Sequence, residues 1–324
     1  MDKKRLRTNI LSKIVLIAIP LFFVFGWFFS YFYPLNELPI GLKSIKRFEL
    51  KRKLSLPKTK EIEISVIQDE DTKTHVRRLV QVKWNGLQTE AYLLMPKDRR
   101  VKYPAILALH GHLTTKEEVV GIKNSRFGVN YGLKLVEAGY CVLAPDIPFA
   151  QNMGFEDHLS LNLIMTGKNL MGLRIAYLEA LLKYFCSLPF VDSKRLGCIG
   201  WSMGGGLTLY LSAIDQRVKV VAISGYFGTY RGIFMKQRHS TDNYIPGILT
   251  FGEMPDVACL IAPRPLWVEG SKKDISFPLE SFMEGLERLK SCYEGNNEYF
   301  AYHIIQGGHR FQGEDIVEWF TKHL

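Results

Sequence analysis

One stretch constrains the fold of this chain more than any other: residues 198–206, Cys-Ile-Gly-Trp-Ser-Met-Gly-Gly-Gly, which contain the pattern G-x-S-x-G. The pattern has chemical meaning only where a strand enters it and a helix leaves it. Both flanks are present, because residues 195–199 form a short apolar run and residues 207–214 continue as an apolar helix. Such a turn holds a serine hydroxyl clear of a sheet, so Ser202 is the candidate nucleophile. The alternative is a glycine-rich turn with an incidental serine.

The residues around Ser202 also suit a binding site for negative charge. Gly200 and Gly204 lack side chains, so a strand and a helix can approach each other closely at this turn. The backbone N–H of Met203 then points toward the same space as the hydroxyl and can bind a developing oxyanion. We therefore predict Met203 as the first oxyanion donor.

Downstream of residue 61, strand-like segments alternate with helix-like segments. Strands are predicted over residues 61–67, 75–84, 89–95, 103–110, 140–146, 195–199, 218–224, 265–269 and 298–305. Helices are predicted over residues 125–138, 169–187, 278–291 and 314–323. This alternation favours an α/β domain over residues 61–324, with a mostly parallel central sheet and helices on both faces. An insertion over about 225–254 is expected to cover the site.

The N-terminal segment has a different character. Residues 1–13 are basic, residues 14–33 are a run of twenty without a charge, and residues 34–60 form a basic tether. Twenty apolar residues span one bilayer core, so we predict a single-pass transmembrane anchor. The basic residues before the run lie nearest to it, which favours a cytoplasmic N-terminus and an exported domain. The alternatives are a cleaved signal peptide or a buried core helix.

The net charge of +10 is concentrated in the first sixty residues. Residues 1–60 hold 13 Lys and Arg against 3 Asp and Glu, and the remaining residues hold 29 of each sign. The domain itself is therefore neutral, which argues against a nucleic-acid-binding surface and places the basic excess beside the predicted membrane anchor. The five cysteines, an odd number, do not indicate a disulfide scaffold, and Cys141 and Cys198 fall in apolar runs typical of buried positions.

The base that would activate Ser202 is predicted from chain order, since in this architecture the acid follows the serine and the histidine follows the acid. His309 comes after Gly307-Gly308, between the last predicted strand and the last predicted helix. The other histidines after Ser202 lie in the insertion, inside a strand and at the chain end, namely His239, His303 and His323. We predict His309 as the general base, against the alternative of a surface-loop histidine.

The acid should lie on the loop after the preceding strand. Asp274 follows the strand at residues 265–269, where its carboxylate can orient the imidazole and stabilise the imidazolium. Three other carboxylates fit less well: Asp256 suits a helix start, Glu269 is still on the strand, and Asp146 precedes the serine and suits a loop-ordering role.

The second oxyanion donor is expected on the loop after the early buried strand. There the sequence reads His110-Gly111-His112, and the glycine lets the N–H of His112 approach the reacting atoms. A metal-binding H-x-H pair is the alternative, but a catalytic metal needs about three protein ligands and residues 113–116 supply none. We therefore predict no metal and no cofactor.

At this point the chain resembles the dienelactone hydrolase and acetylxylan esterase branch of the α/β-hydrolases over residues 75–324. The matching stretches are residues 104–112, 139–146, 195–205, 261–266 and 307–311. The resemblance implies an α/β-hydrolase fold, a triad of Ser202, Asp274 and His309, and oxyanion donors at His112 and Met203. One departure is Ile275, which stands where the family commonly has a proline after the acid.

These features predict a membrane-anchored serine hydrolase that cleaves small-molecule carboxylic esters through an acyl-enzyme. A serine peptidase of the same fold and a non-catalytic, membrane-tethered binding protein are the alternatives. The insertion interleaves aromatic residues with hydrogen-bond donors, which favours a short acyl group on a polar alcohol over a long-chain lipid. The competing interpretation is that these aromatic residues only pack the insertion onto the core.

Overall fold

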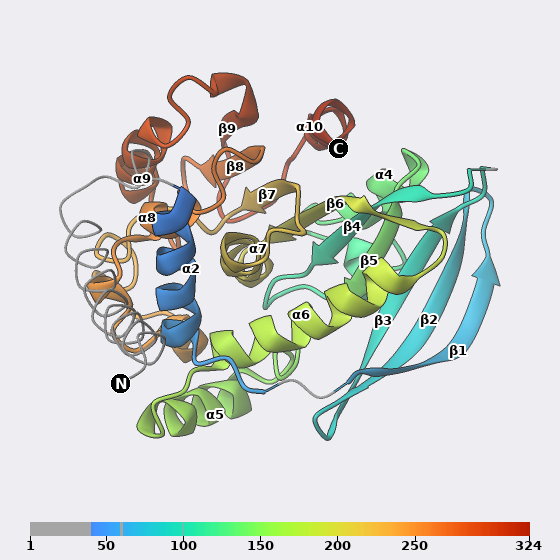
Figure 1. The fold of residues 1–324 in the computed structure, drawn as a ribbon, viewed down its shortest axis with the longest axis horizontal. Coiled ribbons are helices and arrows are strands. Elements are labelled where there is room, and N and C mark those ends of the chain that lie inside the picture. The colour runs from blue at the N-terminus through green and yellow to red at the C-terminus, as the bar shows by residue number, and fades with distance from the viewer. Residues whose placement is uncertain (1–39, 59–60, 99) are drawn as a thin grey trace, which may run out of the picture.

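A nine-stranded sheet runs through the centre of the protein (Figure 1). The computed structural model describes residues 40–58, 61–98 and 100–324. Across the sheet the strands follow the order β1-β2-β3-β5-β4-β6-β7-β8-β9. Their bounds are β1 Glu63–Asp71, β2 His75–Trp84, β3 Leu87–Pro96, β4 Tyr103–Leu109, β5 Cys141–Pro145, β6 Val191–Trp201, β7 Val220–Ser224, β8 Leu266–Ser271 and β9 Phe300–Ile305.

The sheet has an antiparallel part and a parallel part. Strands β1, β2, β3 and β5 pair antiparallel to one another, while every neighbouring pair from β5 to β9 is parallel. The prediction of a mostly parallel sheet is confirmed. Because the carboxyl ends of the parallel strands meet at one edge, the loops after β4, β6, β8 and β9 gather there.

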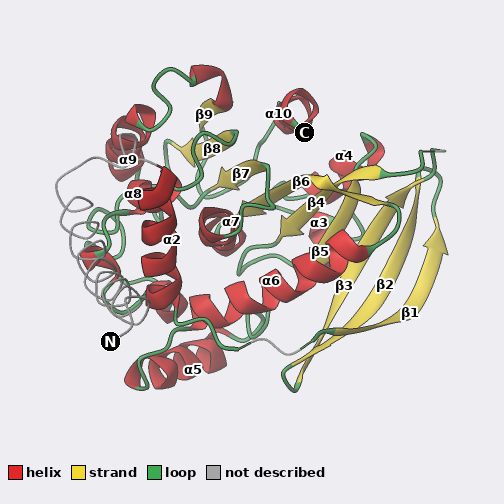
Figure 2. Ribbon diagram, in the orientation of Figure 1, coloured by secondary structure: helices red, strands yellow, loops and turns green. Residues whose placement is uncertain are grey.

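Helices cover both faces of the sheet (Figure 2). Buried β4 shows how: Ala105, Leu107 and Leu109 belong to one apolar cluster, and Ile106 and Ala108 belong to the other. The first cluster packs under α2 Ile40–Leu54, α6 Leu170–Ser187, α7 Met203–Ile214, α8 Met254–Ala258 and α9 Leu279–Ser291. The second packs under α3 Lys116–Val119, α4 Tyr131–Glu137 and α10 Ile316–His323. The described residues also contain the short 3-10 helices η2 Thr241–Asn243, η3 Ile248–Thr250 and η4 Asn297–Tyr299.

The stretch expected to be a basic tether contains helix α2, which packs onto the domain. Leu50 and Leu54 are fully buried in the core. Arg47 donates to the carbonyl oxygens of Ala213 at 3.2 Å and Leu260 at 2.9 Å, near the C-terminal ends of α7 and α8. Cations are stabilised at helix C-termini, where carbonyl groups lack intrahelical donors. Part of the basic excess therefore serves the packing of this helix rather than a lipid surface.

Helix α5, Met153–Met165, was not predicted from the sequence. Its apolar residues do not form one stripe, and Met153, Phe155, Leu161 and Met165 are exposed. Without a helical period of burial, the pattern gives no signal for a helix. The helix begins at Asn152, whose side chain accepts a hydrogen bond from the Phe155 N–H, a typical N-cap.

Replacing Gly172 by alanine should destabilise the protein by about 1–3 kcal/mol, because overpacking forces a backbone shift. A Cβ at Gly172 would lie 1.6 Å from the carbonyl oxygen of Leu54, where α6 meets the end of α2. The matched control is Gly154→Ala on α5, where the nearest atom to a new Cβ is 3.7 Å away. Urea unfolding should give a lower midpoint for Gly172→Ala only. Equal midpoints would contradict the close packing of α2 on α6.

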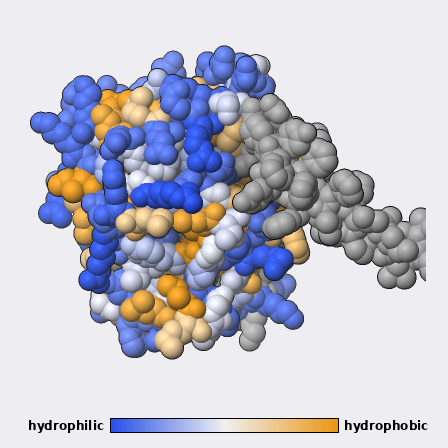
Figure 3. Space-filling model, turned by 90° about the vertical axis from the view of Figure 1, so that its left-hand side faces the viewer, coloured by the Kyte–Doolittle hydropathy of each residue, from blue (hydrophilic) through white to orange (hydrophobic). Residues whose placement is uncertain are grey.

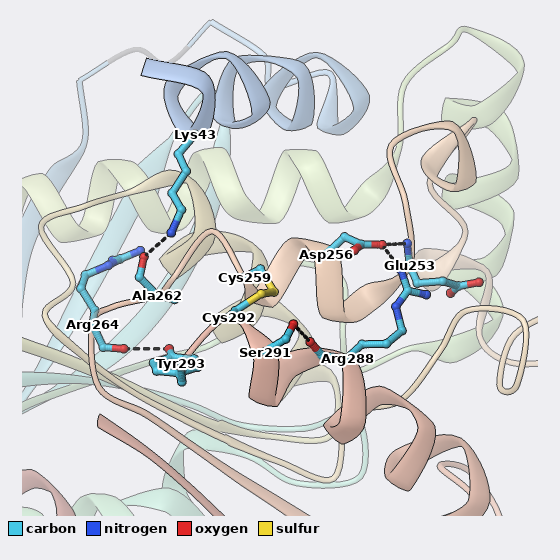
Figure 4. The surroundings of a disulfide bond; sticks show 10 residues. All are labelled: Lys43, Glu253, Asp256, Cys259, Ala262, Arg264, Arg288, Ser291, Cys292 and Tyr293. Carbon is cyan, nitrogen blue, oxygen red and sulfur yellow. Dashed lines mark hydrogen bonds and ion pairs between the residues drawn. A yellow bond between two sulfur atoms is a disulfide. The ribbon is translucent and has the colours of Figure 1, made fainter. Parts of the chain in front are cut away.

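A disulfide joins the ends of two helices that cover the sheet. Cys259, at the end of α8, bonds Cys292, at the end of α9 (Figure 4). The two cysteines are 33 residues apart and meet only through tertiary packing, so spacing alone does not indicate the pair. Cys141 and Cys198 are buried as predicted, and burial raises the pKa of both thiols, which keeps them protonated.

The face where α8 and α9 lie, on the left-hand side of Figure 1, is mainly hydrophilic. Outside the part covered by residues drawn in grey, hydrophobic side chains form small separate groups there (Figure 3). Scattered apolar side chains of this kind are normal on a solvated surface and mark no particular partner.

The predicted transmembrane anchor over residues 14–33 lies outside the described residues, as does the basic segment 1–13. In the part of the chain that the structure describes, no helix is both long and apolar enough to cross a bilayer. Its longest helix, α6, has 18 residues but carries Arg174, Glu179 and Lys183, and charges inside a bilayer are costly. The predicted localisation, a single-pass membrane protein with an exported domain, is therefore contradicted.

Candidate active site

Ser202 lies on a strained turn between β6 and α7. Its backbone has φ 55° and ψ −125°, a conformation that non-glycine residues adopt rarely. The turn is held because the Ser202 N–H donates to the carbonyl oxygen of Ser224 at 2.9 Å and the Ser202 carbonyl accepts from the Gly206 N–H. The predicted strand, turn and helix are all present, so the serine occupies a nucleophile-type elbow at the carboxyl edge of the sheet.

The two glycines of the G-x-S-x-G pattern are required by close backbone contacts. A Cβ at Gly200 would lie 2.1 Å from the carbonyl oxygen of Gly204. A Cβ at Gly204 would lie 2.1 Å from the carbonyl oxygen of Leu109, on the neighbouring strand β4. Any side chain at either position would push α7 away from the sheet and move the serine.

The structure brings Ser202, His309 and Asp274 into one hydrogen-bonded chain. The Ser202 Oγ lies 2.8 Å from Nε2 of His309, and Nδ1 of His309 lies 2.7 Å from Oδ2 of Asp274. These atoms come from the loops after β6, β9 and β8. The imidazole is held on its flat sides by Trp201, with ring centres 4.7 Å apart, and by Phe277, stacked at 5.8 Å.

Asp274 is buried and fixed by its own loop. Its second oxygen, Oδ1, accepts hydrogen bonds from the Ser276 N–H at 2.8 Å and the Phe277 N–H at 3.0 Å. Ile275, which replaces the proline common in the resembling family, is 82% exposed and leaves this geometry intact. Its carbonyl oxygen instead accepts from the side chain of Gln237 in the insertion.

The other carboxylates considered for the acid hold structural contacts. Glu269 is on β8, where it accepts from the Ser224 hydroxyl at 2.7 Å and the Gly313 N–H at 2.8 Å. Burial raises the pKa of Glu269. Asp256 accepts from the Glu253 N–H at the start of α8, and Asp146 pairs with Lys116 at 2.8 Å. None of these three carboxylates contacts His309.

His110 positions the loop that carries the second predicted oxyanion donor. The Ile147 N–H donates to its Nε2 at 3.1 Å, so Nδ1 carries the proton and donates to the Gly111 carbonyl at 2.8 Å. Burial lowers the pKa of His110 to about 4, which keeps this ring neutral near pH 7. A Cβ at Gly111 would lie 2.8 Å from the Trp201 ring, so only glycine lets the loop approach the elbow this closely.

The two predicted oxyanion donors border the same cavity as Ser202, because His112 and Met203 both line it. Met203 is the first residue of α7, and the N–H groups of a first helical turn have no intrahelical acceptor. The N–H of His112 makes no backbone hydrogen bond within the described ranges. Both N–H groups are therefore available to a substrate oxygen.

The cavity at Ser202 has a volume of about 180 Å³. Its walls combine apolar and polar side chains from the β4 loop, α5, α7, the insertion and the Asp274 loop: His112, Leu113, Met153, Ser202, Met203, Tyr226, His239, Ser240, Asn243, Ser276, Phe277 and His309. Two larger hollows, of about 460 and 420 Å³, are lined by none of the triad residues. The small cavity is therefore the candidate active site.

A group of charged side chains that the sequence did not point to lies behind one wall of this cavity. It joins His112 to Glu156 on α5, Arg174 on α6 and Asp242 on η2. Three of these side chains offer metal-ligand atoms within 4.8 Å of one another, namely His112, Glu156 and Asp242. The Arg174 guanidinium pairs with both carboxylates, at 3.2 Å and 2.7 Å, so a cation already compensates one of their two negative charges. The sequence signal for it was Arg174, a charged residue between the apolar residues Leu173 and Ile175 of α6.

The strand order, the parallel half of the sheet and the elbow at Ser202 define an α/β-hydrolase fold. The model of the dienelactone hydrolase family matches residues 89–254, more than half of the chain, and the chain belongs to this family. Family membership confirms the resemblance stated from the sequence. It also makes the chain a homologue of carboxylic ester hydrolases and so confirms the predicted enzyme class.

Relatives and solved structures agree with this assignment. The "Putative hydrolase YtaP" of Bacillus subtilis strain 168 is 26% identical over 276 residues, which cover 82% of this chain and 92% of that protein. A "putative acetyl xylan esterase" of Bacteroides fragilis NCTC 9343 superposes with a TM-score of 0.73 at 16% identity, covering 87% of each chain. Acetyl Xylan Esterase 1 of Thermoanaerobacterium sp. JW/SL YS485 gives a TM-score of 0.60 at 18% identity, covering 90% of this chain and 96% of that one. At these identities the two structures support the fold alone.

Proposed function

We propose that this protein hydrolyses carboxylic esters with short acyl groups through an acyl-enzyme on Ser202. The observation that carries the proposal is the continuous chain from Ser202 Oγ through His309 to Asp274, with contacts of 2.8 and 2.7 Å. His309 takes the Ser202 proton as the hydroxyl attacks the ester carbonyl, and Asp274 holds the ring and stabilises the imidazolium. The N–H groups of His112 and Met203 receive the oxyanion.

The size and lining of the cavity favour a short acyl group. A volume of about 180 Å³ is smaller than the pockets of several hundred Å³ that drug-sized ligands occupy. Polar side chains of His239, Ser240, Asn243 and Ser276 interrupt its apolar wall, so a long alkyl chain finds little continuous apolar contact. A small acyl group on a polar alcohol fits this surface better than a lipid.

The aromatic residues of the insertion contribute less to this argument than their sequence pattern indicated. Tyr226, Phe227, Tyr230 and Phe234 are all buried, and only Tyr226 borders the cavity. The Tyr230 and Tyr210 hydroxyls bond each other at 2.7 Å, which fixes the insertion to α7. These side chains mainly pack the insertion onto the core, which was the competing interpretation, and the short-acyl proposal therefore rests on the cavity.

The acyl preference can be measured with esters of one leaving group and increasing acyl length. We expect kcat/KM to be highest for acetyl or butyryl esters and at least tenfold lower for octanoyl and dodecanoyl esters. A methylene that the cavity excludes gains none of the roughly 0.8 kcal/mol that its burial would contribute, and binding a longer chain requires the cavity wall to move. A preference for octanoyl or longer chains would contradict the proposed substrate class, and faster cleavage of peptides than of esters would favour a serine peptidase.

A further inference from the structure

The charged group behind the active-site wall has a consequence for catalysis. Arg174, Glu156 and Asp242 are at most 1% exposed, and they come from three elements that pack together only in the folded protein. With a neutral His112 this buried group would carry a net charge of −1, and with a protonated His112 it carries none. Because an uncompensated buried charge is strongly unfavourable, the arrangement favours the imidazolium.

The His112 ring is oriented by both carboxylates through one nitrogen. Nε2 lies 2.8 Å from Oε1 of Glu156 and 3.2 Å from Oδ2 of Asp242. Burial alone would lower the pKa of His112, but the hydrogen bonds and charges of Asp242 and Glu156 outweigh it and raise the pKa to about 9. Nε2 therefore carries a hydrogen in either state of the ring, since carboxylates only accept.

The other nitrogen of the ring is not engaged by the buried network. Nδ1 makes no hydrogen bond to any residue that the structure describes, and it is not fully buried. His112 lines the cavity at Ser202. In a neutral ring with its hydrogen on Nε2, Nδ1 would be an acceptor. Only the imidazolium carries an N–H donor at Nδ1 together with a positive charge.

We propose that His112 is a catalytic residue in its imidazolium form, whose Nδ1–H and positive charge stabilise the oxyanion formed when Ser202 attacks the ester. Glu156, Asp242 and Arg174 are positioning residues that hold it there. The inference rests on the proposed ester hydrolysis. In the step, the bond from Ser202 Oγ to the carbonyl carbon forms and the carbonyl π pair moves onto oxygen. His309 takes the Oγ proton, while His112 keeps its own.

Titratable groups lie near His112 in the cavity, in the preceding loop and in the buried network. The cavity side holds His309 and His239, and burial lowers the pKa of His239. The preceding loop holds His110, whose lowered pKa keeps it neutral. The remaining groups are those of the buried network, Glu156 on α5, Arg174 on α6 and Asp242 on η2. The two carboxylates that contact His112 are the groups that raise its pKa.

The first test is His112→Gln in the full chain, with His158→Gln as the matched control. His158 is an exposed histidine on the same α5 helix that carries Glu156. Loss of one oxyanion donor costs on the order of a hundredfold in kcat, and we expect a tenfold to hundredfold fall with KM changed little. A raised KM with unchanged kcat would overturn the catalytic role, because it would indicate ground-state binding only.

A second variant separates a loss of catalysis from a loss of folding. His112→Gln leaves the buried group at −1, whereas the double variant His112→Gln/Glu156→Gln restores a net charge of zero. If the imidazolium acts on the oxyanion, the double variant should fold with a thermal midpoint near that of the wild type and still lose the same tenfold to hundredfold in kcat. Recovery of kcat in the folded double variant would overturn the inference, because it would indicate a merely structural role.

The pH profile gives an independent readout. In the wild type, kcat at saturating ester should fall as the pH rises through about 9, where His112 loses its proton. Glu156→Gln and Asp242→Asn each remove an anion that favours the imidazolium, so this alkaline limb should move at least one pH unit lower. A limb that stays in place in both variants, with circular dichroism showing folded protein, would overturn the inference.

Failure of the proposed function is distinguished by labelling Ser202 with a fluorophosphonate. An unlabelled wild type that also cleaves no ester would count against ester hydrolysis itself. A labelled, active wild type whose His112 variants keep full kcat would overturn only the role of the imidazolium.

Discussion

Replacing Ser202 by alanine should reduce kcat for ester hydrolysis on the order of a million-fold while the protein remains folded. The Oγ removed by this change is the atom 2.8 Å from His309, and losing the nucleophile of such a triad removes the acyl-enzyme route entirely. Alanine keeps a Cβ at the same strained φ of 55°, so the turn and its backbone hydrogen bonds are retained. The measurement is steady-state hydrolysis of an acetyl ester by the purified full chain.

The matched control is Ser212→Ala, on the same helix α7. Ser212 is fully buried away from the cavity and its Oγ has no hydrogen-bond partner within the described residues, so its loss should leave kcat within about twofold. Fluorophosphonate labelling should persist in Ser212→Ala and vanish in Ser202→Ala. Full activity in a folded Ser202→Ala enzyme would remove Ser202 as the nucleophile and with it the proposed mechanism.

Replacing Asp274 by asparagine should lower kcat on the order of ten-thousand-fold. The Asp274 carboxylate accepts from Nδ1 of His309 at 2.7 Å, which leaves Nε2 free to take the serine proton. An amide in its place can donate to Nδ1 and so favours the wrong tautomer, and it no longer stabilises the imidazolium. Asparagine retains an oxygen for the Ser276 and Phe277 N–H groups, so the loop should keep its shape.

Two other acid-to-amide changes separate this effect from a general loss of charge. Asp256→Asn removes the charge that pairs with Arg288, Asp146→Asn removes the charge that pairs with Lys116, and neither carboxylate contacts His309. We expect each to change kcat less than tenfold, with any larger effect confined to stability. A greater loss of kcat in Asp256→Asn than in Asp274→Asn would show that the acid has been assigned to the wrong residue.

Much of the parallel half of the sheet could be predicted, because each buried strand carries its own apolar run. The runs at residues 103–110 and 218–224 correspond to β4 and β7, and the long amphipathic segment 169–187 corresponds to α6. The first helix of the described chain could not be predicted in the same way. Its basic residues suggested a tether, whereas Arg47 binds carbonyl groups near the ends of α7 and α8 that only the folded chain brings near. Lys43 likewise donates to the carbonyl oxygen of Ala262, beyond the end of α8 (Figure 4).

The candidate site likewise has a part that the sequence predicted and a part that it did not. The G-x-S-x-G pattern selected Ser202 and chain order selected Asp274 and His309, since each follows a strand whose carboxyl end reaches the same edge of the sheet. The buried network of His112, Glu156, Arg174 and Asp242 has no such order, because its members come from a loop, two helices and the insertion. No local pattern indicates that four such charges will meet.

The sequence by itself thus determined the fold class, the strained turn at Ser202 and the order of the triad residues, because these depend on short-range patterns of apolar residues and glycines. Only the tertiary structure decided the docking of α2, the pairing of Cys259 with Cys292 and the assembly of the buried charges around His112. Each of these depends on contacts between residues far apart in the chain. Their burial and charge are set by how the helical layers close over the sheet, and no local segment encodes that closure.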